Sequence, residues 1–247
     1  LRAAAAGKAI FCEKPIDQDL ARARGAAGAL ANALLLLAFN RRFDPNFRAL
    51  KARLDSGAVG RLESLQITSN DPSPPPPSYV AVSGGLYKDM AIHDFDMARW
   101  LLGEEPIEVY AAGSCLVDPE IGRLGDIDTA RTVLKTASGR LCVIANSRRS
   151  GFGYDQRIEA YASAGMVRAD NVLESTVQTW GEGGAASDRF QNFFLARYAE
   201  AYRGEMDHFA DMLAGAAASV GYADGVAALA LAEAAARSLA SGQPVAP

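Results

Sequence analysis

Two short, uninterrupted apolar runs lie close together at the start of the sequence. Ala9–Cys12 and Leu34–Phe39 flank an Ala- and Leu-rich segment, Ile16–Leu30, which carries Asp17 and Asp19 in its first turn. Strands that are buried on both faces are continuously apolar, and a strand, a helix and a second strand at this spacing form a parallel unit. Because parallel pairs rarely occur alone, we expect these two strands to belong to a larger parallel sheet.

After residue 60 the pattern changes to short alternating segments separated by turn residues, as in an antiparallel sheet. The expected strands are 61–69, 107–117, 129–136, 141–147, 156–162, 166–169 and 174–180. The segments with helical spacing are 44–54, 85–102, 191–214 and 224–241. Consecutive prolines within Pro72–Pro77 exclude a helix or an inner strand there. The sequence therefore predicts a parallel α/β fragment, an antiparallel α+β domain of about six or seven strands, and two closing helices.

The composition narrows the function classes. The 247 residues carry a net charge of −4 without a basic cluster, which argues against a nucleic-acid partner. Apolar stretches such as Ala33–Phe39 are far shorter than the ~18–20 residues of a membrane-spanning helix. Cys12, Cys115 and Cys142 are widely spaced and form no CxxC pair, which fits a reducing compartment, so we expect a cytoplasmic protein.

The predicted helix 85–102 carries a polar stripe. Asp89, His93 and Asp96 are spaced i, i+4 and i+7, so on one continuous helix they share a face. An Asp one turn from a His can fix the imidazole tautomer and keep the ring ready to take a proton near neutral pH. A capped helix terminus with an incidental histidine is the alternative. We expect no metal site, because a convincing third or fourth ligand is missing.

Basic side chains follow both predicted parallel strands. Lys14 comes directly after the first strand, and Arg41 and Arg42 come after the second. Ligands bind at the carboxyl ends of strands in open parallel α/β sheets, so these side chains are placed to meet in one crevice. Alternatively, Lys14 is a surface lysine of a strand–helix loop, and the arginines pair with Asp44 and Glu13.

Three motifs, in this order and spacing, resemble the Gfo/Idh/MocA oxidoreductases, and most closely their inositol 2-dehydrogenases. The motifs are Glu13-Lys14-Pro15, Asn40-Arg41-Arg42-Phe43 and Gly84-Gly85-x-x-x-Asp89-x-x-x-His93-Asp94-x-Asp96. Further matches at 153–157, 191–194 and 224–225 extend the resemblance over essentially the whole chain. The lysine motif alone is weak evidence for this family, but its combination with the Asp-x-x-x-His helix is specific for it.

The resemblance implies a fold and a domain division. The family has a Rossmann domain followed by an open-faced α+β domain, and substrate and nicotinamide meet at their junction. Residues 1–43 are then the C-terminal remnant of a dinucleotide-binding domain, residues 44–221 a substrate and oligomerisation domain, and residues 222–247 a helix that packs back on the Rossmann part. The expected fold class is the C-terminal part of a Rossmann-type parallel sheet joined to an open-faced, mostly antiparallel sheet with helices on one side.

The resemblance also implies roles for individual residues. Lys14 is expected to hydrogen-bond the substrate hydroxyl near the nicotinamide, His93 to take the hydroxyl proton, and Asp89 to orient His93. The expected substrate-binding residues are Arg41, Asp71 and Tyr154. The expected cofactor-binding residues are Glu13, Lys14, Pro15 and Arg41. His208 is expected to lie outside the site.

The expected activity is NAD-dependent oxidation of a secondary hydroxyl of a cyclic polyol, with myo-inositol and its 2-keto product as the first choice. The alternatives are a dehydrogenase for another sugar, a non-catalytic sugar or dinucleotide sensor on the same fold, and an inactive remnant. NADP is an alternative cofactor, because in the family the residue that discriminates between NAD and NADP lies upstream of Glu13. The family's GxGxxG turn also lies upstream, so about 80 residues of the dinucleotide fold are expected to be missing.

One face of the predicted antiparallel sheet is left uncovered by the helices that follow it. We expect this open face to pack against another copy of the chain, in a homodimer or homotetramer.

Overall fold

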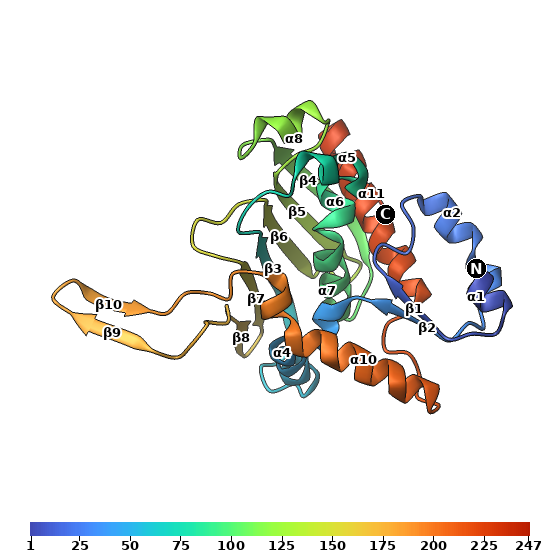
Figure 1. Cartoon of the computed structure of the whole chain (residues 1–247), viewed down its shortest axis with the longest axis horizontal. Coiled ribbons are helices and arrows are strands. Elements are labelled where there is room, and N and C mark those ends of the chain that lie inside the picture. Colours follow the sequence, from blue (N-terminus) through green and yellow to red (C-terminus); the bar gives the residue numbers. More distant parts are fainter.

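The computed structural model describes residues 1–247 and contains a six-stranded sheet, a two-stranded parallel sheet and a separate β-hairpin (Figure 1). The strands are β1 (Ile10–Glu13), β2 (Leu35–Ala38), β3 (Leu62–Asn70), β4 (Pro106–Ser114), β5 (Thr129–Thr136), β6 (Leu141–Ser147), β7 (Asp155–Ala162), β8 (Gly165–Ala169), β9 (Gln178–Gly181) and β10 (Gly184–Ser187). The helices are α1 (Arg2–Ala5), α2 (Leu20–Gly25), α3 (Ala27–Leu30), the 3-10 helix η1 (Asn40–Phe43), α4 (Pro45–Asp55), α5 (Pro77–Ser83), α6 (Gly85–Asp89), α7 (Ile92–Leu102), α8 (Pro119–Arg123), α9 (Phe194–Arg197), α10 (Ala199–Leu213) and α11 (Tyr222–Ser241). None of the helices combines the length and the apolar character that crossing a bilayer requires.

The large sheet has the strand order β4-β5-β6-β3-β7-β8. Every neighbouring pair is antiparallel except β3 and β6, which run parallel with Ser64 opposite Leu141 and Asn70 opposite Ser147. The carboxyl ends of β3 and β6 therefore lie at the same edge of the sheet. The prediction of a mostly antiparallel sheet is confirmed, and the segment 61–69 does join it.

Alternation along the strands gives the large sheet two different faces. Side chains such as Val109, Leu134 and Ile144 are fully buried, and α7 and α11 pack against that side of the sheet. The neighbouring positions on the other side of the strands are exposed, among them Tyr110 and Leu141. A half-buried antiparallel sheet has this period of two. The sheet is thus covered by helices on one face and open on the other, as the sequence predicts.

The N-terminal strands form the predicted parallel unit. β1 and β2 pair in parallel from Ile10 opposite Leu35 to Glu13 opposite Ala38, and all four residues of β2 are buried. The closing helix α11 contacts β2 and α2 as well as α6, α7 and β4 of the large-sheet region. A Cβ at Gly225 would lie only 2.5 Å from Cδ2 of Leu37, so glycine permits this close approach of α11 to β2.

One hydrophobic core of 40 buried residues extends from β2 through α7 and the large sheet to α11. α11 therefore belongs to the same packing unit as the segments on either side of it. The domain boundaries at residues 43 and 221 stay predictions.

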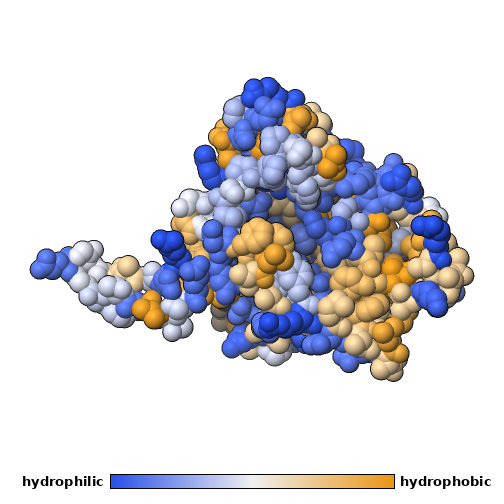
Figure 2. Space-filling view, viewed as in Figure 1, coloured by the Kyte–Doolittle hydropathy of each residue, from blue (hydrophilic) through white to orange (hydrophobic).

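Four predicted elements differ from those observed. The helix predicted over 191–214 is two helices, α9 and α10, with Tyr198 between them. The helix predicted over 16–30 begins only at Leu20, because the Asp19 carboxylate accepts a hydrogen bond from the Arg22 amide and caps it. The helix predicted over 85–102 is two helices, α6 and α7, with Met90 and Ala91 between them. The strand predicted at 174–180 is wrong as a member of the large sheet, because its last residues form the isolated β9–β10 hairpin. Figure 2 shows this hairpin standing clear of the body, with every residue of its strands exposed.

Candidate active site

A cavity of about 780 Å³ lies where the carboxyl ends of β1 and β2 meet the large-sheet region. Its wall includes seven of the eight site residues that the sequence predicts: Glu13, Lys14, Arg41, Asp71, Asp89, His93 and Tyr154. Only Pro15 does not line it. The cavity is also lined by residues that the sequence analysis did not select: Arg148, Tyr79, Tyr198, Tyr202, the segment Pro72–Pro76 and the segment Phe193–Leu195.

Lys14 reaches into this cavity from the end of β1. Its Nζ donates a hydrogen bond of 2.6 Å to the backbone oxygen of Asp89 and lies 3.5 Å from the Asp89 carboxylate. Burial lowers the pKa of Lys14, Asp89 opposes that shift, and the net pKa stays below the ordinary lysine value. Lys14 is therefore a fixed hydrogen-bond donor in the cavity, and not a mobile surface lysine.

His93 lies in the first turn of α7. Its Nδ1 is buried and has no hydrogen-bond partner, and Phe39 meets the ring edge-on at 6.0 Å between centroids. Burial lowers the pKa of His93 well below its ordinary value, and the positive charges of Lys14 and Arg41 add to the shift. The imidazole is thus neutral at pH 7 and can accept a proton.

The contact between the Asp89 and His93 side chains that the helical spacing predicts is not observed. No hydrogen bond joins the two side chains; the Asp89 carboxylate accepts one from Tyr79 Oη at 2.7 Å and one from Arg148 Nη1 at 2.9 Å. The i, i+4 relation fails because the chain leaves the helical path between α6 and α7. Burial raises the pKa of Asp89, but Lys14 and Arg148 outweigh it and hold the pKa below its ordinary value. Asp89 is therefore an ionised partner of Lys14.

Asp96, the third member of the predicted stripe, does not join the site. Its carboxylate accepts two hydrogen bonds from Arg42, at 2.6 and 2.8 Å, and Arg42 also pairs with Asp224 of α11. Arg42 is thus structural, although its partners are not the Asp44 and Glu13 that the sequence suggested. Its guanidinium ties η1 to α7 and to the closing helix.

Arg41 lines the cavity with its guanidinium already paired. Nη1 donates to the fully buried Asp94, and Nη2 donates to Ser69 Oγ at 3.2 Å. Asp94 also accepts a hydrogen bond of 2.8 Å from Asn146. Breaking a buried pair of this kind leaves an uncompensated charge, so Arg41 stabilises the floor of the cavity as well as lining it.

The opposite wall is aromatic and acidic. Tyr154 is buried and packs edge-on against Tyr198 at 6.0 Å between centroids. Asp71 follows the last residue of β3, where burial raises its pKa to about 6 against the opposing charge of Arg148. His208 is outside the cavity and accepts a hydrogen bond from the Ser219 amide, as expected for a structural histidine.

The described residues fit one end of a dinucleotide cofactor. Lys14 and the unpartnered, buried Nδ1 of His93 belong to a cavity at the carboxyl ends of two parallel strands, where nicotinamide folds present their reactive groups. A GxGxxG turn, which holds the pyrophosphate in such folds, does not occur within residues 1–247.

The sequence is similar to those of known proteins over most of its length. Residues 47–168 match the model of the GFO/IDH/MocA C-terminal domain. An inositol 2-dehydrogenase of Rhizobium meliloti is 47% identical over 99% of this chain and 75% of its own length. The chain belongs to the Gfo/Idh/MocA family.

Solved structures of the family superpose on nearly the whole chain. A myo-inositol dehydrogenase from Corynebacterium glutamicum gives a TM-score of 0.95 at 41% identity, over 99% of this chain and 74% of that one. A scyllo-inositol dehydrogenase from Lactobacillus casei, solved with bound NAD(H) and scyllo-inositol, gives 0.89 at 28% identity over the same shares. The predicted family and the predicted fold class are thereby confirmed.

The sequence marks Asp71 as a site residue only through the family resemblance, and it does not single out Arg148. Arg148 directly follows β6, and Asp71 directly follows β3; the parallel pairing of these strands brings both residues to one edge. That pairing links segments far apart in the chain, so alternation within each strand cannot reveal it. Tyr79 follows the proline run and carries no motif of its own.

Proposed function

We propose that this Gfo/Idh/MocA protein is an NAD-dependent dehydrogenase that oxidises a secondary hydroxyl of a cyclic polyol, with myo-inositol as the preferred substrate. The observation that carries the proposal is that Lys14, held by Asp89, and the buried, unpartnered Nδ1 of His93 belong to one cavity. The names of the Rhizobium and Corynebacterium relatives support inositol as the substrate class. The bound NAD(H) of the Lactobacillus enzyme supports NAD as the cofactor, and an assay with both cofactors distinguishes it from NADP.

Lys14 and His93 have different roles at the substrate hydroxyl. Lys14 donates a hydrogen bond to the hydroxyl oxygen and stabilises the negative charge that develops there. His93 accepts the hydroxyl proton, which it can do because its low pKa keeps it neutral at pH 7. NAD supplies the acceptor for the hydride that leaves the same carbon. Asp89 balances the charge of Lys14 and fixes its position through the 2.6 Å contact with the backbone oxygen.

The rest of the cavity is suited to a ring with several hydroxyl groups. Asp71, which lines the wall, is a hydrogen-bond acceptor when ionised, and Tyr154 can both donate and accept. Proline and phenylalanine side chains of Pro72–Pro76 and Phe193–Leu195 supply apolar surface for the C–H faces of such a ring. A small-molecule site commonly combines such apolar surface with polar groups that fix the orientation of the ligand.

Activity of the full-length protein with a substrate panel tests this proposal. Reduction of NAD and of NADP is followed by absorbance with myo-inositol, scyllo-inositol and several hexoses. The His93→Gln variant is expected to lose about 10²- to 10⁴-fold in kcat, because the proton acceptor is gone. His208→Gln, which changes the chain's other histidine, is the matched control and should keep wild-type activity. A wild-type protein that is inert toward every polyol and sugar would refute the proposal.

We also propose that the open face of the large sheet packs against a second copy of the chain. Exposed apolar side chains gather there: Tyr110, Leu141, Val143, Tyr161 and Met166. Exposed apolar side chains that share one face of a sheet favour an interaction site there. Light scattering that reports a monomer at micromolar concentration would contradict this assembly.

A further inference from the structure

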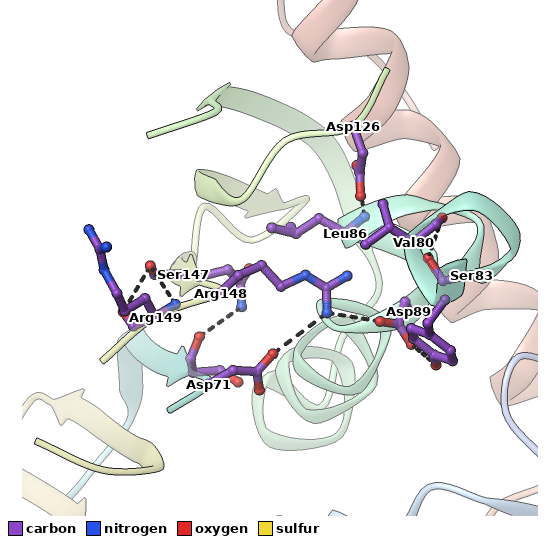
Figure 3. A network of polar contacts seen from close by, with 12 residues as sticks. Asp71, Val80, Ser83, Leu86, Asp89, Asp126, Ser147, Arg148 and Arg149 are labelled. Carbon is purple, nitrogen blue, oxygen red and sulfur yellow. Dashed lines mark hydrogen bonds and ion pairs between the residues drawn. The ribbon is translucent and has the colours of Figure 1, made fainter. Parts of the chain in front are cut away.

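Arg148 is the most buried cation of the cavity that the mechanism above does not use. It follows β6 with 3% of its surface exposed. Its Nη1 lies 2.9 Å from Oδ2 of Asp89 and 3.6 Å from Oδ2 of Asp71 (Figure 3). One guanidinium nitrogen thus holds two carboxylates that come from different segments, α6 and the end of β3.

The same two carboxylates anchor the proline segment. Asp71 begins it, and the Asp71 amide donates a hydrogen bond of 2.9 Å to the Ser147 carbonyl beside Arg148. Tyr79 ends it, and the Tyr79 hydroxyl bonds Asp89 Oδ1 at 2.7 Å. We call residues 71–79 the proline strap. Both of its ends are therefore tied to the Arg148–Asp89 pair, while Pro72–Pro76 line the cavity between them.

Lys14 completes the arrangement on the other side of Asp89. Its Nζ contacts both the backbone oxygen and, at 3.5 Å, the carboxylate Oδ1 that Tyr79 also bonds. With Arg148 and Tyr79 each bound to Asp89, the carboxylate cannot rotate freely. Lys14 therefore has a fixed anionic partner.

We propose that Arg148 is a positioning residue, which fixes the Asp89 carboxylate and through it aligns Lys14 and the proline strap around the substrate. This inference rests on the proposed dehydrogenase function. Arginine suits the role, because its guanidinium stays charged when it is buried and can therefore pair with both carboxylates, here through Nη1. Without that charge, Asp71 and Asp89 face each other across the cavity edge as unbalanced like charges.

The charged and titratable groups that surround Lys14 set the direction of the test. They are Asp89 on α6, Tyr79 on α5, Arg148 after β6, Asp71 after β3, Arg41 in η1 and His93 on α7. Loss of Arg148 removes a positive charge from this group and leaves Asp89 with fewer partners besides Lys14. Both changes stabilise the ammonium form, so the pKa of Lys14 is expected to rise.

The experiment compares Arg148→Met, Arg148→Lys and Tyr79→Phe, with Arg149→Met as the control at an exposed neighbour without an ion pair. Arg148→Met is expected to lower kcat/KM about 10- to 100-fold and to move the alkaline limb of the pH profile upward. Arg148→Lys keeps the charge, so its alkaline limb should lie at the wild-type pH, whereas its kcat/KM should recover only in part. Tyr79→Phe frees one end of the strap and should cost about 3- to 10-fold.

A second readout does not depend on turnover. Trace acetylation of Lys14 across the pH range, measured by mass spectrometry without substrate, gives the midpoint of its titration in each variant. This midpoint should rise in Arg148→Met and stay at the wild-type value in Arg148→Lys and Arg149→Met. If wild type oxidises no polyol, the proposed function fails, while the midpoint still tests the role of Arg148.

Two results would overturn the role of Arg148. One is an unchanged Lys14 midpoint and pH profile in a folded Arg148→Met variant. The other applies if Arg148→Met does not fold. In that case, a wild-type kcat/KM in both Arg148→Lys and Tyr79→Phe would overturn the role.

Discussion

Glu205 is a buried carboxylic acid without a compensating charge. It lies on α10 with 1% of its surface exposed, and its Oε1 has no hydrogen-bond partner. Burial, and to a lesser extent the nearby charge of Glu13, raise the pKa of Glu205 to about 8. Replacing Glu205 with glutamine keeps the shape of the side chain and removes its ionisation. We therefore expect Glu205→Gln to stabilise the protein near neutral pH.

The size of the effect follows from proton linkage. An unfolded glutamate titrates near 4.5, so between that pH and about 8 the folded protein holds a proton at Glu205 that the unfolded chain has released. Stability is therefore lost as pH rises through this window, by up to about 1.4 kcal/mol per pH unit. At pH 7 the acid costs about 3 kcal/mol, and at pH 5 less than about 1 kcal/mol.

Urea denaturation at pH 5 and pH 7 measures this difference. Glu205→Gln should raise the free energy of unfolding by about 3 kcal/mol at pH 7 and by much less at pH 5. Glu200→Gln on the same helix is the matched control, because Glu200 is largely exposed and its surface pair with Arg203 contributes little. An equal gain at both pH values, or a loss of stability at pH 7, would refute the linkage reasoning.

Three further outcomes are expected. Asp94→Ala leaves Arg41 buried without its partner and should lower the free energy of unfolding by about 3–5 kcal/mol in urea denaturation; a loss under about 1 kcal/mol would contradict this. Gly225→Val places a Cβ 2.5 Å from a leucine methyl of β2 and should cost about 1–3 kcal/mol, seen as a lower Tm, whereas an unchanged Tm would mean that α11 packs differently. The pH profile of kcat/KM should rise on an acid limb below pH 6.5, where His93 loses its proton, and fall on an alkaline limb below pH 10.5, where Lys14 does; an acid limb above pH 6.5, or no alkaline limb below pH 10.5, would contradict these assignments.

The local pattern of apolar residues in the sequence was sufficient to predict most of the strands and helices. The strands Thr129–Thr136 and Leu141–Ser147 have the predicted bounds, because alternation with a period of two is a property of each strand and of the face it buries. The parallel pairing of β1 and β2 was also predictable, since continuous apolar runs this close together leave few other arrangements. Motif order then placed Lys14 and His93 in one cavity.

The partners of the site residues were decided by the tertiary structure. Helical spacing assigned Asp89 to His93, but the break between α6 and α7 turns the Asp89 carboxylate toward Tyr79 and Arg148. Arg41, likewise, binds Asp94 from a segment about fifty positions away. Hydrogen bonds and ion pairs depend on atoms meeting within about 3 Å, which periodicity along one segment cannot specify.

The sequence by itself thus determined most of the strands and helices, because burial imposes a period that each segment records locally, and its motifs marked seven of the side chains that line the cavity. The tertiary structure alone decided that Asp89 serves Lys14, that Arg148 joins it to the proline strap, and that the β9–β10 hairpin leaves the large sheet. Those outcomes rest on the packing of segments distant in the chain, because burial and the charges nearest in space together set the pKa values and the geometry of a buried site.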